Sequence, residues 1–379
     1  MGLFLLWFFF GIGLVIQIVY LLFIFGRVAF NSTKNPASTD SQKEEGVTVL
    51  VAAHNEFTNL KILIPKLFEQ NYSNYDVMIV NDRSTDRTKR LLEEMMEIYP
   101  RLRSVTIKYT PVHVTPKKFA LTLGIKVSKN DVILLTDADC IPQTDNWIKK
   151  MTAPVREHSK TFSLGFSGYE KKPGFLNSWI QFETLLTALF YLSFGLWKKP
   201  FMGIGRNLCY RKRFFMEVKA FKGFWHVEGG DDDLFVNQYA TGKNTAIVID
   251  PEANTLSYPK TNKAEYFVQK KRHLHAGKYY RGEDKQKIGF YSLSHALFWL
   301  GGIGLLIYFG IDQSWEQFLI VLGIILLRSV LLLSIFNSAS KRIQGIKAPI
   351  NTWVQDLVYL GYFWVLGSIS QQAKDIKWK

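Results

Sequence analysis

The chain has 379 residues, of which 47% are hydrophobic, and this apolar fraction excludes a largely disordered protein. Its formal net charge of +15 predicts partners of negative charge, such as anionic lipids or an anionic substrate. Nucleic acid is the rival partner, but the basic residues are scattered and no nucleic-acid motif accompanies them, so we expect none. Cys140 and Cys209 are the two cysteines of the sequence, which excludes a disulfide framework or a zinc site.

Membrane spans are predicted at both ends of the chain. Residues 3–25 carry no charge and are long enough to cross a bilayer core of about 30 Å. They lack the basic start and the cleavage site of a signal peptide, so we expect an uncleaved anchor in residues 1–30. Residues 288–309 and 318–336 predict two further spans, in which Arg328 must face protein, water or a lipid headgroup.

The last apolar stretch, residues 350–370, contains Asp356 and is open to three interpretations. It can cross the bilayer, lie at the interface or re-enter, so residues 288–379 are expected to form a membrane region of two or three helices. Basic residues beside the spans, among them Arg27 and Lys341, follow the positive-inside rule. We therefore expect an integral, multi-pass membrane protein whose central part is cytoplasmic.

Strand and helix patterns alternate in this central part, residues 47–287, which follows a polar linker at residues 31–46. We expect strands at 47–53, 75–80, 104–109 and 132–135, and helices at 60–68, 91–96 and 119–127. The alternation predicts an α/β domain with a mainly parallel central sheet and right-handed crossovers. Residues 174–200 are too polar for a clear span, and we expect either an amphipathic helix that lies at the membrane surface or covers the ligand site, or an ordinary core helix.

Two carboxylates, Asp137 and Asp139, follow directly after the predicted strand at residues 132–135. In an open α/β sheet the ligand crevice lies at the carboxyl ends of the strands, and side chains two apart point the same way. The pair can therefore face one ligand together. Mg²⁺ or Mn²⁺ held by Asp137 and Asp139 and completed by substrate phosphates fits this arrangement, and a solvated turn is the alternative.

A second acidic cluster lies in the sequence GGDDDL, where Asp231, Asp232 and Asp233 are consecutive. If the cluster is partly buried, desolvation and like charges raise the carboxyl pKa values, as a general base near neutral pH requires. The alternative is that the aspartates only cap a helix. Further on, Gln269 and Arg272 would share one face of a helix, where Arg272 suits a diphosphate unless that face is merely solvated.

Taken in order, VAAHNE, VNDRSTD, PKKFALTLG, the D-x-D and GGDDDL resemble the motifs of the inverting family 2 glycosyltransferases. That family has the GT-A nucleotide-sugar-binding fold, and the resemblance is to its cellulose, hyaluronan and poly-N-acetylglucosamine synthase branch. It implies that Asp82 bonds the base and that the strand end at Ala53, with Glu56, helps to form the nucleoside pocket. It also implies that Lys117 is the lysine of the family's G-K-x-x-A-L segment, with Pro116 in place of the glycine.

The same resemblance assigns roles to the acidic residues. Asp137 and Asp139 match the D-x-D that contacts the ribose and the metal-bound diphosphate. GGDDDL is similar to the family's E-D motif, with Gly230 in place of the glutamate. Asp231 falls on the position of the catalytic base, and Asp232 is the second candidate for that role.

The fifth motif, Q-x-x-R-W, matches at Gln269 and Arg272, which the resemblance implies bind the donor, whereas His273 replaces the tryptophan. The implied function is a membrane-bound inverting transferase that moves a sugar from a nucleotide-sugar donor, expected to be UDP-linked, to a hydroxyl of a glycan or lipid-linked acceptor. The missing tryptophan favours an alternative, a transferase that adds one sugar to a ceramide or polyprenyl phosphate. A catalytically silent membrane partner is the other alternative.

Overall fold

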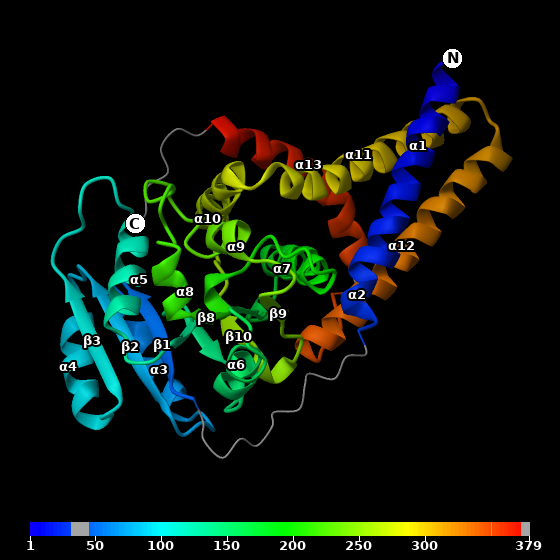
Figure 1. The fold of residues 1–379 in the computed structure, drawn as a ribbon. Coiled ribbons are helices and arrows are strands. Elements are labelled where there is room, and N and C mark those ends of the chain that lie inside the picture. The colour runs from blue at the N-terminus through cyan, green and yellow to red at the C-terminus, as the bar shows by residue number, and fades with distance from the viewer. Residues whose placement is uncertain (32–44, 350, 373–379) are drawn as a thin grey trace.

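The computed structural model describes residues 1–31, 45–349 and 351–372. The expected linker at residues 31–46 lies, except for its ends, outside the described residues. In Figure 1 an α/β part with two sheets lies on one side, and a bundle of long helices extends away from it.

The larger sheet has seven strands in the order β3-β2-β1-β4-β8-β6-β9. Their bounds are β1 Val47–Ala53, β2 Tyr75–Asp82, β3 Leu102–Ile107, β4 Val132–Leu135, β6 Phe162–Leu164, β8 Leu208–Arg211 and β9 Thr245–Ile247. The first four pair in parallel, which confirms the mainly parallel α/β sheet, whereas β8 runs antiparallel to both of its neighbours. A smaller sheet has the order β5-β10-β7, with bounds Cys140–Pro142, Thr255–Ser257 and Ser167–Tyr169.

Helices cover both faces of the larger sheet, which explains why β1 is apolar at nearly every position. Val49 and Val51 pack in one core cluster and Leu50 packs in the other, because successive side chains of a strand point to opposite faces. The first cluster includes residues of α3 Phe57–Phe68, α4 Thr88–Ile98 and α6 Trp147–Glu157. The second includes residues of α5 Pro116–Val127, α7 Phe175–Leu196 and α8 Lys212–Glu217.

The described residues contain four helices that are long and apolar enough to cross a membrane. Three belong to the bundle: α1 Gly2–Val19, which continues through a π-helical turn into α2 Gly26–Ala29, then α11 Gly282–Ile311 and α12 Trp315–Gln344. The fourth is α7, but most of it is buried inside the protein, between the α/β part and the bundle. Of the two interpretations of residues 174–200, this burial favours a core helix.

Close approach of backbones joins α1 to α11. A Cβ atom added at Gly13 would lie 2.5 Å from the backbone nitrogen of Phe298, so only glycine permits this contact. Small residues at such crossings are typical of helices that pack within a bilayer, where tight packing replaces the hydrophobic effect. Gly11, one half-turn earlier on the same helix, has open space at the equivalent position.

We therefore expect Gly13→Leu to push α1 and α11 apart, with a loss of about 1–3 kcal/mol in stability, as for overpacked cores. Gly11→Leu is the matched control and should leave stability nearly unchanged. The measurement is the thermal unfolding midpoint of both variants in detergent. Equal midpoints for Gly13→Leu and Gly11→Leu would contradict the close contact.

Candidate functional site

Polar residues gather at one edge of the larger sheet, at the carboxyl ends of its parallel strands. β1 lies between β2 and β4, so the strand order reverses at β1, and a ligand crevice is expected at this switch point. Ala53 ends β1, Asp82 ends β2, and Asp137 follows the end of β4 by two residues. Residues far apart in the sequence therefore share one edge.

Lys117 links the two acidic motifs. It is the second residue of α5, and its Nζ lies 3.0 Å from Asp137 Oδ1 and 3.1 Å from Asp231 Oδ2. Burial alone would lower the pKa of Lys117, but Asp137, Asp231 and Asp232 outweigh burial and raise it. Lys117 is therefore a permanent cation held between carboxylates of two separate motifs.

Asp137 and Asp139 form the group best suited to a divalent cation. Their carboxylates and the Cys140 thiol all lie within 4.8 Å of one another. The thiol donates to Asp139 Oδ1 at 3.3 Å, the Ser257 hydroxyl donates to Asp139 Oδ2 at 3.2 Å, and burial raises the pKa of Cys140 well above its ordinary value. Mg²⁺ and Mn²⁺ prefer oxygen to a protonated thiol, so the two carboxylates fit a hard cation and Cys140 serves to orient Asp139.

Asp231 is buried, with 5% of its surface exposed. Burial raises the pKa of its carboxyl group, but Lys117 and Lys118 outweigh burial, and the pKa of Asp231 is lowered. The expectation of raised pKa values throughout the acidic cluster is therefore wrong for Asp231. This carboxylate is ionised near neutral pH, and its basicity depends on how strongly Lys117 pairs with it.

Asp232 and Asp233 follow the expectation for crowded acidic groups. Burial, followed by the neighbouring carboxylates, raises the pKa of Asp232 and raises that of Asp233 to about 8. Asp232 accepts hydrogen bonds from the backbone of Gly205 at 2.5 Å and of Asp233 at 2.7 Å, and so it caps α9 Asp233–Tyr239. Asp233 accepts one from the Tyr280 hydroxyl at 2.7 Å. Both carboxylates are held by the protein's own donors.

Lys118 ties the start of α5 to the loop that precedes the aspartates. Its buried ammonium group donates to the backbone carbonyls of Val227 and Gly229. Beside it, the Thr115 backbone N–H donates to the Trp225 carbonyl at 2.9 Å. Lys118 thus fixes the position of this loop relative to Lys117, a role that the sequence pattern did not indicate.

Arg206 is a second cation that the sequence did not assign to the site. It lies in a short turn, Gly205–Asn207, with its guanidinium 4.4 Å from the centre of the Tyr169 ring. Burial alone would lower the pKa of Arg206. The net effect is a raised pKa, because the charges of Tyr169, Cys140 and the D-x-D carboxylates Asp139 and Asp137 outweigh burial. The two glycines before it indicate a tight turn, but only the pairing of distant strands brings its charge near the D-x-D.

α10, Lys263–Ala276, carries Gln269, Arg272 and His273. A Cβ atom at Gly229 would lie 3.8 Å from Arg272 Cγ, so Arg272 lies beside the loop that leads to the aspartates. Desolvation by the surrounding protein, and then nearby lysine and arginine charges, lower the pKa of His273 well below its ordinary value. His273 is therefore a neutral imidazole at physiological pH.

The nucleoside side of the predicted site lies at the ends of β1 and β2. Asp82 pairs with Arg83 through both oxygens, at 2.8 and 3.0 Å, and strand order separates it from Asp137 by the width of β1. Glu56 accepts a hydrogen bond from Asn59 at 2.6 Å. Burial, together with the charges of the D-x-D, raises the pKa of Glu56, so Glu56 lies within electrostatic reach of the metal-binding pair.

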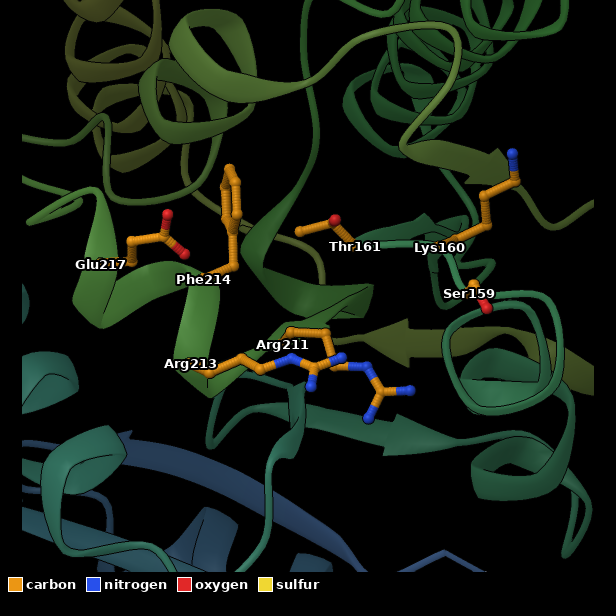
Figure 2. A pocket seen from close by; sticks show the side chains of 7 residues that line it. All are labelled: Ser159, Lys160, Thr161, Arg211, Arg213, Phe214 and Glu217. Carbon is orange, nitrogen blue, oxygen red and sulfur yellow. The ribbon is translucent and has the colours of Figure 1, made fainter.

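A separate hollow of about 170 Å³ lies between β8, α8 and the segment before β6 (Figure 2). Arg211, Arg213, Phe214 and Glu217 contribute to its lining, and it contains none of the residues predicted for the site. Arg211 is paired with Glu45 and with Asp131, so its charge is already balanced within the protein.

Comparison with known proteins finds similarity over the part of the chain that contains Asp82, Lys117, Asp137 and Asp139. Residues 48–219 match the family model "Glycosyl transferase family 2". An uncharacterized glycosyltransferase of Haemophilus influenzae is 24% identical over 172 residues, which are 45% of this chain and 49% of that protein. A poly-beta-1,6-N-acetyl-D-glucosamine synthase of Staphylococcus aureus is 27% identical over 123 residues, 32% of this chain and 29% of the synthase. The chain thus spans about half the length, or less, of these curated relatives.

Among solved structures, the mannosyltransferase PcManGT from Pyrobaculum calidifontis, in complex with GDP-Man and Mn²⁺, is similar over 93% of this chain and 99% of that chain. The TM-score is 0.58 and the sequence identity is 14%, so the similarity concerns the fold. It confirms the predicted GT-A architecture. Residues 48–219 of this chain therefore form a domain of the glycosyltransferase family 2 type.

Proposed function

We propose that this chain is a membrane-bound inverting glycosyltransferase, with Asp231 as the general base that activates an acceptor hydroxyl. The observation that carries the proposal is the position of Lys117, which lies within 3.1 Å of both Asp137 and Asp231. One cation thus joins the predicted donor-binding motif to the predicted base. In an inverting displacement the acceptor oxygen attacks the anomeric carbon while the diphosphate leaves, so both groups must lie next to one reaction centre.

The donor diphosphate is proposed to bind at Asp137 and Asp139 together with Mg²⁺ or Mn²⁺. The bound cation would neutralise negative charge on the leaving diphosphate. The Pyrobaculum mannosyltransferase, which was solved with GDP-Man and Mn²⁺, supports a metal and a nucleotide sugar in this fold. Lys117 and Arg272 add fixed positive charge, which stabilises the transition state most where the charge develops.

The assignment of Asp231 as the base rests on its partners. Asp232 is engaged by two backbone N–H groups, so it has less freedom to accept a proton from a substrate. Asp231 is ionised, as a base must be, but the charge of Lys117 weakens it. A diphosphate bound beside Lys117 would share that charge, and Asp231 would then become more basic at the moment when a donor is present.

The nucleoside is proposed to lie at the ends of β1 and β2, with Ala53, Glu56 and Asp82 lining its pocket and Gln269 reaching the donor from α10. A UDP-linked sugar is our preferred donor, because the synthase branch that the motifs resemble mostly uses UDP. GDP-linked sugar is the rival, since the mannosyltransferase neighbour binds GDP-Man.

The acceptor is proposed to be a glycan or a lipid-linked sugar at the membrane. A specific observation favours the second candidate function, addition of a single sugar to a membrane lipid. The residue after Arg272 is His273, a small neutral imidazole where the polymerising synthases have a tryptophan for the acceptor chain. A ladder of product lengths from one reaction would support a polymerase, and a single product would support the second candidate.

For the membrane, we propose that α1, α11 and α12 cross the bilayer and that the α/β part is cytoplasmic. Their length and hydropathy support three crossings, and the basic residues Arg27, Lys341 and Arg342 near the α/β end of the bundle agree with the positive-inside rule. α13, Thr352–Gln372, is not among the described helices that satisfy the criteria for a span.

The function is tested with purified protein in lipid nanodiscs, supplied with a panel of nucleotide sugars, Mn²⁺ or Mg²⁺ and a membrane lipid extract as acceptor. We expect one donor to give nucleoside diphosphate and a glycosylated product, and we expect excess EDTA to abolish both. No turnover with any donor, in the presence of metal and acceptor, would favour a catalytically silent membrane partner.

In this assay Asp231→Asn should lower kcat by about 10²- to 10⁴-fold, because the amide cannot accept the proton of the acceptor hydroxyl. Donor affinity should not fall, because Lys117 keeps its charge and loses a competing carboxylate. Asp145→Asn removes an exposed carboxylate and serves as the control. If Asp232→Asn lost more activity than Asp231→Asn, Asp232 would be the base instead.

The raised pKa of Asp233 predicts that the stability of the protein depends on pH. Its pKa is about 8 in the folded protein against an ordinary value of 3.8, so between these values only the folded state holds the proton. The free energy of unfolding therefore falls as the pH rises through this window. Asp233→Asn cannot titrate, and its amide can accept from the Leu234 backbone while it donates to the Tyr280 oxygen, so it should flatten the fall. Thermal midpoints at pH 5, 6.5 and 8 check this, and parallel curves for variant and native protein would contradict it.

A further inference from the structure

A cluster of polar side chains is buried inside the helical bundle. Arg328 of α12 pairs with Asp356 of α13, and the two side chains are 0% and 1% exposed. Asp356 also accepts a hydrogen bond from Trp299 at 3.1 Å and lies 3.2 Å from His295 Nε2, both on α11. Gln17 of α1 accepts a hydrogen bond from Arg328 at 2.5 Å. The cluster therefore joins four helices.

Stability alone does not account for this cluster. Burying two charges costs hydration free energy, and their mutual attraction offsets this cost only narrowly. Apolar side chains of similar volume therefore often stabilise a protein as well or better. Ionisable residues inside a membrane bundle are therefore a marker of function. What the Arg328–Asp356 pair supplies is a fixed position, because the single carboxylate of α13 is matched by donors from α11 and α12.

The helix that depends on this pair is α13, whose residues in contact with other helices lie on one face. They are the adjacent residues Gln355 and Asp356, followed at intervals of three by Tyr359 and Tyr362. Gln355 donates to Ser178 of α7 at 2.8 Å, and the Tyr362 ring lies 4.8 Å from the Trp179 ring of the same helix. These protein contacts fix where α13 lies.

From α13 the contacts continue to α10 and the candidate site. The hydroxyl groups of Tyr362 and Tyr266 lie 3.0 Å apart, and the buried Tyr266 also accepts from Trp179 at 3.0 Å. Two turns after Tyr266, α10 presents Arg272 beside the loop that leads to the aspartates. In Figure 1 α13 runs from the bundle to α10 above the α/β part.

We propose that Arg328 and Asp356 are positioning residues for sugar transfer: they fasten α13 in the bundle, α13 holds α10, and α10 holds Arg272 and His273 at the reaction centre. This inference rests on the proposed function. The donor motifs on β1, β2, β4 and α5 do not depend on α13. Loss of the pair should therefore reduce turnover strongly, while donor binding loses only the share that Gln269 and Arg272 of α10 contribute.

The test uses full-length protein in nanodiscs with the double variant Arg328→Met/Asp356→Leu, which removes both charges and leaves no unpaired one. We expect its thermal midpoint to remain near the native value and its affinity for nucleoside diphosphate with Mn²⁺ to fall much less than kcat. We expect kcat to fall by about 10²-fold, as for a misplaced reacting group. Arg328→Lys keeps the charge and should retain most of the turnover. Asp312→Asn, an exposed carboxylate at the far end of the bundle, is the control.

A second readout does not require any sugar transfer. Spin labels at Val268→Cys on α10 and Val358→Cys on α13 occupy exposed positions, and the two native cysteines are buried. We expect a narrow distance distribution in the native background and a broad one in Arg328→Met/Asp356→Leu. Tyr266→Phe, which removes the hydroxyl link, should broaden it as well.

The two readouts separate the possible failures. Native turnover in the double variant would overturn the positioning role, as would a narrow spin-label distribution in that background. A parallel loss of thermal midpoint, donor affinity and turnover would also overturn it, because the pair would then be merely structural. Absence of turnover in the native protein, with the distance changes as expected, would overturn the proposed function and leave the mechanical link between bundle and α10 standing.

Discussion

The site depends on one ammonium group surrounded by carboxylates. Lys117 balances Asp137 and Asp231, which would otherwise repel each other in a partly dry crevice. Neighbouring contacts hold the rest of the acidic cluster in position. Lys118 fixes the loop that carries Asp231, and the Gly205 backbone N–H donates to Asp232. A charged ligand that competes for Lys117 therefore changes the state of the whole acidic cluster.

Much of this arrangement could be predicted from the sequence, for physical reasons that are specific to each residue. Asp82 and Asp137 follow apolar strands, and the ends of parallel strands must meet at one edge, so their common location follows from the pattern alone. Lys117 required the family resemblance, because nothing in a helical pattern says which of two adjacent lysines points to the site. The parallel sheet and the apolar helices were equally evident from periodicity and length.

Other features could not be predicted because they arise only from tertiary pairing. Arg206 approaches the D-x-D because β8 inserts antiparallel beside β4, and no local signal in a Gly-x-Gly turn indicates that. The lowered pKa of Asp231 reflects cations from α5 rather than its acidic neighbours in the sequence. Likewise, the partners of Arg328 and Asp356 lie on helices separated by long stretches of chain, so the sequence could predict that these charges need partners but could not name them.

Burial of α7 has a consequence for how the protein can be divided. One continuous core contains Leu50 and Met78 of the sheet together with Val28 of α2 and Phe336 of α12. Cutting the chain at residue 47 or 287 would therefore not release a water-soluble α/β domain. It would expose a large apolar surface on α7 and on the sheet face that α7 covers. The boundary between the α/β part and the helical bundle runs through shared side-chain packing, so we expect the two parts to unfold as a single cooperative unit.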